Sequence, residues 1–142
     1  MPIPNAITRT VELPHPAATV WAAISTPEGL AGWFGQRVEG EVAPGSSLVM
    51  SWDNGHRSEL SVKVVEPAAV FAYCWPIYGV PAEDPRRTYV EFRLAPTGSR
   101  TTLTVTESGF AQLPDEWLGS YQGNTEGWAA ELAELVAYLA AS

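Results

Sequence analysis

Four side chains in this sequence are candidates for moving a proton to or from a bound molecule. They are His56, Glu107, Tyr73 and Tyr78, and general acid–base catalysis would need them within hydrogen-bond reach of the reacting atoms. No G-x-S-x-G, H-E-x-x-H or C-x-x-C motif and no glycine-rich phosphate loop accompanies them. The sequence therefore predicts no catalytic residues, no metal site and no cofactor, and an enzyme built on these four groups is kept as an alternative.

Glu107 stands out among the four because it falls in phase with Leu103 and Val105 in an alternating strand pattern. A carboxylate on an apolar face must lie at a wet sheet end, pair with a donor, or have a raised pKa. It can also accept a hydrogen bond from a ligand hydroxyl or amine, so both interpretations stay open. His56 follows a turn, where a solvated loop histidine is more common than a catalytic base.

Aromatic residues, rather than catalytic motifs, characterise this sequence. It contains 6 Trp, 5 Tyr and 4 Phe in 142 residues, and side chains of this size line either a dense core or a cavity. The core candidates are Trp21, Trp128, Leu135 and Leu139. Residues with polar tips or near an expected opening are the candidate ligand-binding residues, namely Trp33, Met50, Trp52, His56, Tyr73, Trp75, Tyr78, Glu107, Phe110, Trp117 and Tyr121.

Composition and charge narrow the functional class. The chain has 46% hydrophobic and 17% charged residues and a net charge of −8, which opposes binding to nucleic-acid phosphates or anionic lipid. No signal peptide and no apolar run of about 18 residues is visible. The single Cys74 excludes an intramolecular disulfide and a cysteine-based zinc site. We expect one domain over residues 1–142, soluble and cytoplasmic, with no nucleic-acid or membrane partner.

The hydrophobic pattern predicts an α+β domain. A strand spans Ala6 to Glu12, a helix follows Pro16, and a second short helix runs from about Pro27 to Phe34. Short runs rich in Val, Phe, Tyr, Trp and Thr, separated by Pro and Gly turns, predict an antiparallel meander from Val38 to Gly109. The last helix carries an apolar stripe from Trp117 to Leu139.

Alternation assigns the side chains of the predicted sheet to its two faces. The residues that share a face are Leu48, Met50 and Trp52; Leu60, Val62 and Val64; Phe71, Tyr73 and Trp75; Val90, Phe92 and Leu94; and Leu103, Val105 and Glu107. Between the first two of these strands a two-residue turn would bury a charged residue, whereas a three-residue loop over 53–55 pairs Leu48 with Leu60. We therefore predict the three-residue loop, with Gly55 left-handed and His56 beside Trp52.

Four segments, in order along the chain, resemble the Hsp90-ATPase-activator homology family of the START-like superfamily. They are VWAAISTPEGLAGWFG over 20–35, VVEPAAVFAYCW over 64–75, ESGF over 107–110 and GWAAELAELVAYL over 127–139. The resemblance implies a helix-grip fold, in which a curved antiparallel sheet wraps around one long C-terminal helix and two short helices close one end. It also implies a hydrophobic cavity between sheet and helix.

The resemblance and the aromatic content together favour a binding protein. Its ligand would be a small apolar or aromatic molecule, such as a lipid, a polyketide or an aromatic metabolite, held between the sheet and the last helix. Cyclases, aromatases and dehydratases also occur in the superfamily, so an enzyme using the same cavity is one alternative. A co-chaperone-like interaction module is another, although this chain has one domain and the eukaryotic activators carry an additional N-terminal domain.

Two surface features have both a functional and a structural interpretation. Small residues on the back of the last helix would allow a homodimer or merely loosen the helix start; they are Gly119, Gly123, Gly127, Ala130, Ala137 and Ala141. The run from Val80 to Arg87 is either an entrance loop or an ordinary solvated connection.

Overall fold

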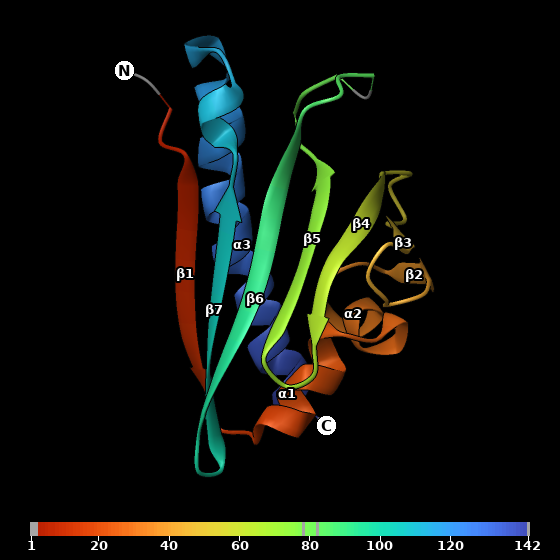
Figure 1. The fold of residues 1–142 in the computed structure, drawn as a ribbon, viewed down its shortest axis with the longest axis vertical. Helices are drawn as coiled ribbons and strands as arrows, with labels where there is room; N and C mark the ends of the chain where they lie inside the picture. The colour runs from red at the N-terminus through yellow and green to blue at the C-terminus, as the bar shows by residue number, and fades with distance from the viewer. Residues whose placement is uncertain (1–2, 78, 82, 142) are drawn as a thin grey trace.

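One curved sheet wraps around a single long helix (Figure 1). The computed structural model describes residues 3–77, 79–81 and 83–141. Neighbouring strands are antiparallel and follow the order β1-β7-β6-β5-β4-β3-β2. The elements are β1 (Ala6–Leu13), α1 (Ala17–Ile24), α2 (Pro27–Trp33), β2 (Arg37–Gly40), β3 (Ser47–Ser51), β4 (Arg57–Glu66), β5 (Val70–Pro76), β6 (Arg87–Thr97), β7 (Arg100–Ser108), η1 (Phe110–Gln112), η2 (Asp115–Trp117) and α3 (Leu118–Ala140). This architecture confirms the α+β helix-grip fold.

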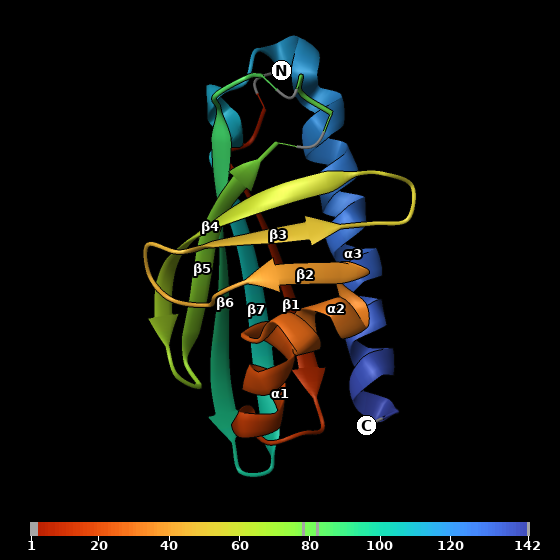
Figure 2. The same cartoon turned by 90° about the vertical axis from the view of Figure 1, so that its right-hand side faces the viewer.

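The two short helices lie beside the C-terminal half of α3, at one end of the sheet (Figure 2). Thr26 begins α2, because its side-chain oxygen accepts a hydrogen bond of 2.9 Å from the backbone N–H of Gly29. Pro27 takes the first helical position, where its missing N–H costs nothing. The helix ends at Trp33, which brings the following Phe34 into the interior.

The β3–β4 hairpin has the predicted register. Leu48 pairs with Leu60, and the backbone N–H of Trp52 donates to the carbonyl of His56 over 3.0 Å, which leaves residues 53–55 as the loop. Gly55 has a φ of 90°, a conformation that favours glycine. The hairpin projects from the sheet toward α3 (Figure 2), so it can form one wall of a space above that helix.

The prediction that Val64 continues the inward face of Val62 is wrong. The register of β4 against β5 shifts between these two residues, so that Val62 pairs with Tyr73 but Val65 pairs with Phe71. Because the bulge inserts one extra residue, Val65 takes the inward position and packs against the core.

Aromatic rings occupy much of the space between sheet and helix. The ring of Phe92 on β6 stacks 6.1 Å from Phe71 and meets Trp33 and Trp128 edge-on at 6.3 and 5.8 Å. Edge-to-face and offset arrangements of this kind are the favoured geometries of aromatic pairs. The predicted sheet faces therefore converge on α3 as a packed aromatic cluster.

The long helix α3 is amphipathic. Its buried residues are Ser120, Trp128, Leu132, Leu135 and Leu139, while the predicted core residue Trp21, on α1, is partly buried. The opposite side of α3 is exposed to solvent. Among the residues that the structure describes, no helix has both the length and the apolar character needed to cross a membrane.

Replacing Gly29 with alanine is expected to destabilise the corner that positions Phe34. A Cβ at this position would lie 2.2 Å from the carbonyl oxygen of Ala22, a backbone atom of α1 that cannot move aside. We expect Gly29→Ala to lower the free energy of unfolding by about 3 kcal/mol, measured by urea denaturation. The control is Gly119→Ala, whose Cβ meets nothing within 4 Å and which should leave stability unchanged or slightly raised. Equal stability of the two variants would contradict this prediction.

Candidate functional site

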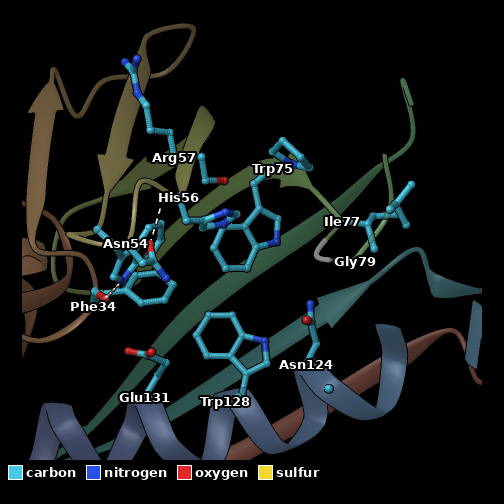
Figure 3. Close-up of a pocket in the computed structure, with 16 residues that line it drawn as sticks. Phe34, Asn54, His56, Arg57, Trp75, Ile77, Gly79, Asn124, Trp128 and Glu131 are labelled. Atoms are coloured by element: carbon cyan, nitrogen blue, oxygen red, sulfur yellow. Dashed lines mark hydrogen bonds between the residues drawn. The ribbon is translucent and has the colours of Figure 1, made fainter. Parts of the chain in front are cut away.

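A pocket of about 630 Å³ lies between the β3–β4 hairpin, the end of β5 and the middle of α3 (Figure 3). Its lining residues are Phe34, Trp52, Asn54, His56, Arg57, Ser58, Trp75, Pro76, Ile77, Gly79, Val80, Gly123, Asn124, Gly127, Trp128 and Glu131. The hairpin residues Asn54, His56 and Arg57 are exposed, so the pocket communicates with solvent on that side.

Three aromatic rings from three different segments form one wall of the pocket. Phe34 follows α2, Trp75 extends from β5 and Trp128 extends from α3 (Figure 3). Their ring centroids are 5.5 to 5.9 Å apart, with interplanar angles of 32° to 48°. We call these three residues the aromatic wall. Trp52 and His56, whose centroids are 5.1 Å apart, line the hairpin side.

Glu107 lies behind this wall and is completely buried. Its carboxylate accepts four hydrogen bonds, from Trp75 Nε1 (2.8 Å), Thr88 Oγ1 (2.5 Å), Asn124 Nδ2 (3.0 Å) and Trp128 Nε1 (2.8 Å). Each oxygen accepts two of them, and within the described residues no cation forms an ion pair with it. Of the possibilities for this carboxylate, pairing with donors is the one observed. The donors come from β5, β6 and α3, so one side chain joins the sheet to the helix.

The hydrogen bonds also decide what the pocket can offer a ligand. The indole N–H groups of Trp75 and Trp128 are committed to Glu107, and that of Trp52 donates to the carbonyl of Phe34 over 3.2 Å. These tryptophans therefore present ring faces and edges without a spare donor. Such a wall suits flat apolar or aromatic groups.

Two titratable groups near the pocket have perturbed pKa values. Burial raises the pKa of Glu131, which lines the pocket from α3, from 4.5 to about 7, and the neighbouring Glu134 adds to this shift. Burial also raises the pKa of Tyr73 well above 10.0, with the charges of Glu107 and Glu131 acting in the same direction. The Tyr73 hydroxyl is fully buried and has no hydrogen-bond partner among the residues that the structure describes.

The predicted ligand-binding residues separate into two groups. Trp52, His56 and Trp75 line the pocket, with Glu107 directly behind it. Tyr78 lies outside the described residues. The others lie elsewhere: Trp33, Met50, Tyr73 and Phe110 are buried in the core, and Trp117 and Tyr121 pack against the core around the start of α3.

Several residues of α3 line the pocket but are not among the ligand-binding residues predicted from the sequence. Asn124 and Glu131 flank Trp128 at helical spacing, and this spacing was the available signal that all three share one side of the helix. Gly123 and Gly127, which the sequence places on a face of small residues, also line the pocket. A Cβ at either glycine would meet nothing within 4 Å, so their missing side chains leave this space open.

The sequence matches the model of one protein family. Residues 14–140 match the model of a family described as Activator of Hsp90 ATPase homolog 1-like protein. No curated protein shows a significant match to the sequence.

Several solved structures share the fold. Protein MLL2253 from Mesorhizobium loti is 27% identical with a TM-score of 0.80, and the match covers 95% of this chain and 98% of that one. DynU16, a protein of the dynemicin biosynthetic locus, is 26% identical with a TM-score of 0.80; the match covers 96% of this chain but 47% of DynU16, so this chain spans about half of that relative. The Aha1 dimer from Colwellia psychrerythraea is 19% identical, with a TM-score of 0.78 and coverage of 94% and 95%, and shows the fold alone.

Replacing Glu107 with glutamine is expected to weaken the contact between sheet and helix. The amide nitrogen would face two donors instead of accepting from them, so buried N–H or O–H groups would lose their partner. We expect Glu107→Gln to lower the free energy of unfolding by about 3 kcal/mol and to change the near-ultraviolet circular dichroism of the tryptophans. The matched control is Glu91→Gln on β6, whose carboxylate pairs with Arg93 at the surface over 3.2 Å. A similar loss in both variants would contradict the role of Glu107.

The raised pKa of Glu131 predicts a pH-dependent stability. Below about pH 4.5 the group is protonated in both the folded and unfolded states. Between there and about pH 7 the unfolded state releases the proton first, so stability falls as the pH rises. We expect Glu131→Gln to exceed the wild type in stability at pH 8 by more than at pH 5, measured by urea denaturation. Glu126→Gln removes the same charge from α3 and should show no such difference between the two pH values.

Proposed function

Because this chain belongs to the Activator of Hsp90 ATPase homolog 1-like family and has an aromatic pocket between its sheet and α3, we propose that it binds a small apolar or aromatic molecule there. A lipid, a polyketide or an aromatic metabolite is the class of ligand that such a pocket accepts. The observation that carries the proposal is the aromatic wall, whose two indoles are held by the buried carboxylate of Glu107.

The size and preorganisation of the pocket support binding. Its volume of about 630 Å³ lies within the usual range of small-molecule sites, roughly 300–1,000 Å³. Hydrogen bonds already fix the indoles of Trp75 and Trp128, so little rotamer freedom is lost when a ligand arrives. The likeness to DynU16, a protein of a biosynthetic locus, is consistent with a small-molecule ligand.

The structure separates the four groups of the predicted acid–base set. Both oxygens of Glu107 are already engaged by two donors each, and Tyr73 is enclosed in the core. Among the described residues, His56 is therefore the member of the proposed acid–base set that lines the pocket. Glu131 also lines the pocket, so an enzyme at this site would have to use His56 with Glu131 instead of the predicted set. Binding needs no such pair, and it is the function that we propose.

Filling the pocket from α3 tests the proposal. Gly127 lines the pocket and a Cβ there meets nothing within 4 Å, so the side chain of Gly127→Leu should occupy ligand space without disturbing the core. We expect the wild type to bind the neutral fluorophore N-phenyl-1-naphthylamine with quenching of tryptophan emission, and Gly127→Leu to raise its Kd about tenfold or more.

Gly119→Leu is the matched control for this experiment. Gly119 lies on the same helix, and a Cβ there is equally unobstructed, but it does not line the pocket. The Kd of Gly119→Leu should equal that of the wild type. No binding to the wild type, or equal binding to both variants, would refute the proposed site. Native mass spectrometry of the purified protein would show independently whether a small molecule is retained.

A further inference from the structure

We propose that the ligand of this pocket carries a positive charge, as an organic amine or quaternary ammonium group that lies against the aromatic wall and near the carboxylate of Glu131. This inference rests on the binding function proposed above and adds the chemical class of the ligand. It follows from three observations. The indole N–H groups are already used in hydrogen bonds, two carboxylates lie in or behind the pocket, and the side chain of Arg57 points away from Trp75 and Trp128.

A carboxylate and an amide line the helix side of the pocket. The side-chain nitrogen of Asn124 donates one hydrogen bond to Glu107 over 3.0 Å, so its carbonyl oxygen and its second N–H are left for a ligand. Glu131 contributes a carboxylate from the same side of α3, and the indoles of Trp75 and Trp128 have no N–H to spare. A positively charged ligand is matched to the carboxylate of Glu131, whereas an anion would be repelled by it.

The buried charge of Glu107 makes the aromatic wall more attractive to a cation. The faces of aromatic rings carry partial negative charge and attract ammonium groups within about 6 Å of the centroid. Trp75 and Trp128 both donate their N–H groups to Glu107, which raises the electron density of the two indole rings that line the pocket. One carboxylate therefore strengthens the cation–π character of two indoles.

The pKa of Tyr73 reports the same electrostatic field. Burial is the main reason why its pKa is raised, but the charges of Glu107 and Glu131 both contribute. The same two carboxylates act on the pocket, because Glu131 lines it and Glu107 lies behind its aromatic wall. Glu134 on α3 adds a further negative charge beside Glu131.

The cationic residue that lines the pocket does not oppose this assignment. Arg57 is exposed at the start of β4, and Figure 3 shows its side chain extending away from Trp75 and Trp128. His56, the other titratable group of the hairpin side, lies against Trp52. The attractive charges thus gather on the α3 side, and Ile77 is available for the apolar part of the ligand.

Three probes of the same shape but different charge test the inference. Phenyltrimethylammonium, tert-butylbenzene and benzenesulfonate are cationic, neutral and anionic, and each would displace N-phenyl-1-naphthylamine at pH 8 if it occupies the pocket. We expect the cation to bind about tenfold more tightly than the neutral probe, and the sulfonate more weakly than both. Neutral binding equal to that of the cation, or tightest binding by the sulfonate, would overturn the charge preference while leaving the binding function intact. Failure of all three probes to displace bound N-phenyl-1-naphthylamine would also overturn the inference, whereas failure of N-phenyl-1-naphthylamine itself to bind would refute the binding function.

Glu131→Gln separates the contribution of this carboxylate from that of the rings. We expect it to weaken binding of phenyltrimethylammonium about fivefold at pH 8 and to leave tert-butylbenzene unchanged. Lowering the pH to 6 should weaken cation binding more in the wild type than in the variant, because Glu131 gains a proton there and His56, which also lines the pocket, is present in both proteins. Glu126→Gln, which removes a charge from α3 outside the pocket, should behave as the wild type. An equal pH response in the wild type and in Glu131→Gln would contradict the role of Glu131.

Discussion

The arrangement of this molecule depends on how one buried carboxylate is stabilised. Glu107 extends from β7 into the space between sheet and helix, where an isolated charge would be very unfavourable. Four neutral donors from β5, β6 and α3 surround it instead. Since two of the donors are the indoles of Trp75 and Trp128, the interaction that joins the layers also orients the rings of the pocket. The fold and the proposed binding function therefore share one physical cause.

Much of the fold could be predicted from local patterns. The α3 stripe and the Asn54-Gly55 turn are strong signals, and the hairpin register follows once charge is kept out of the core. Val64 could not be placed in this way, because the bulge in β4 arises from its pairing with β5 rather than from the residues around it. Strand alternation is thus a reliable guide only as far as the ladder stays regular.

The candidate site could be predicted only in part, for a similar reason. Trp52 and Trp75 were accessible to prediction because strand alternation and polarity mark them as inward residues near an end of the sheet. Trp33 is also a tryptophan, but it lies deeper in the molecule than Trp52 and Trp75. Its N–H donates to the carbonyl of Ala23 inside the core. Glu131 was not predicted, because its position in the pocket depends on how far the hairpin reaches over α3.

Gly123 and Gly127 have a consequence for how proteins of this shape can diverge. Both positions line the pocket beside the buried stripe of α3, and a Cβ at either one meets nothing within 4 Å, so a side chain acquired there would occupy the pocket without repacking the core. The volume of the pocket and the packing of the core thus depend on different residues of one helix. Substitutions at these two positions would change the shape of the pocket while the scaffold stays the same.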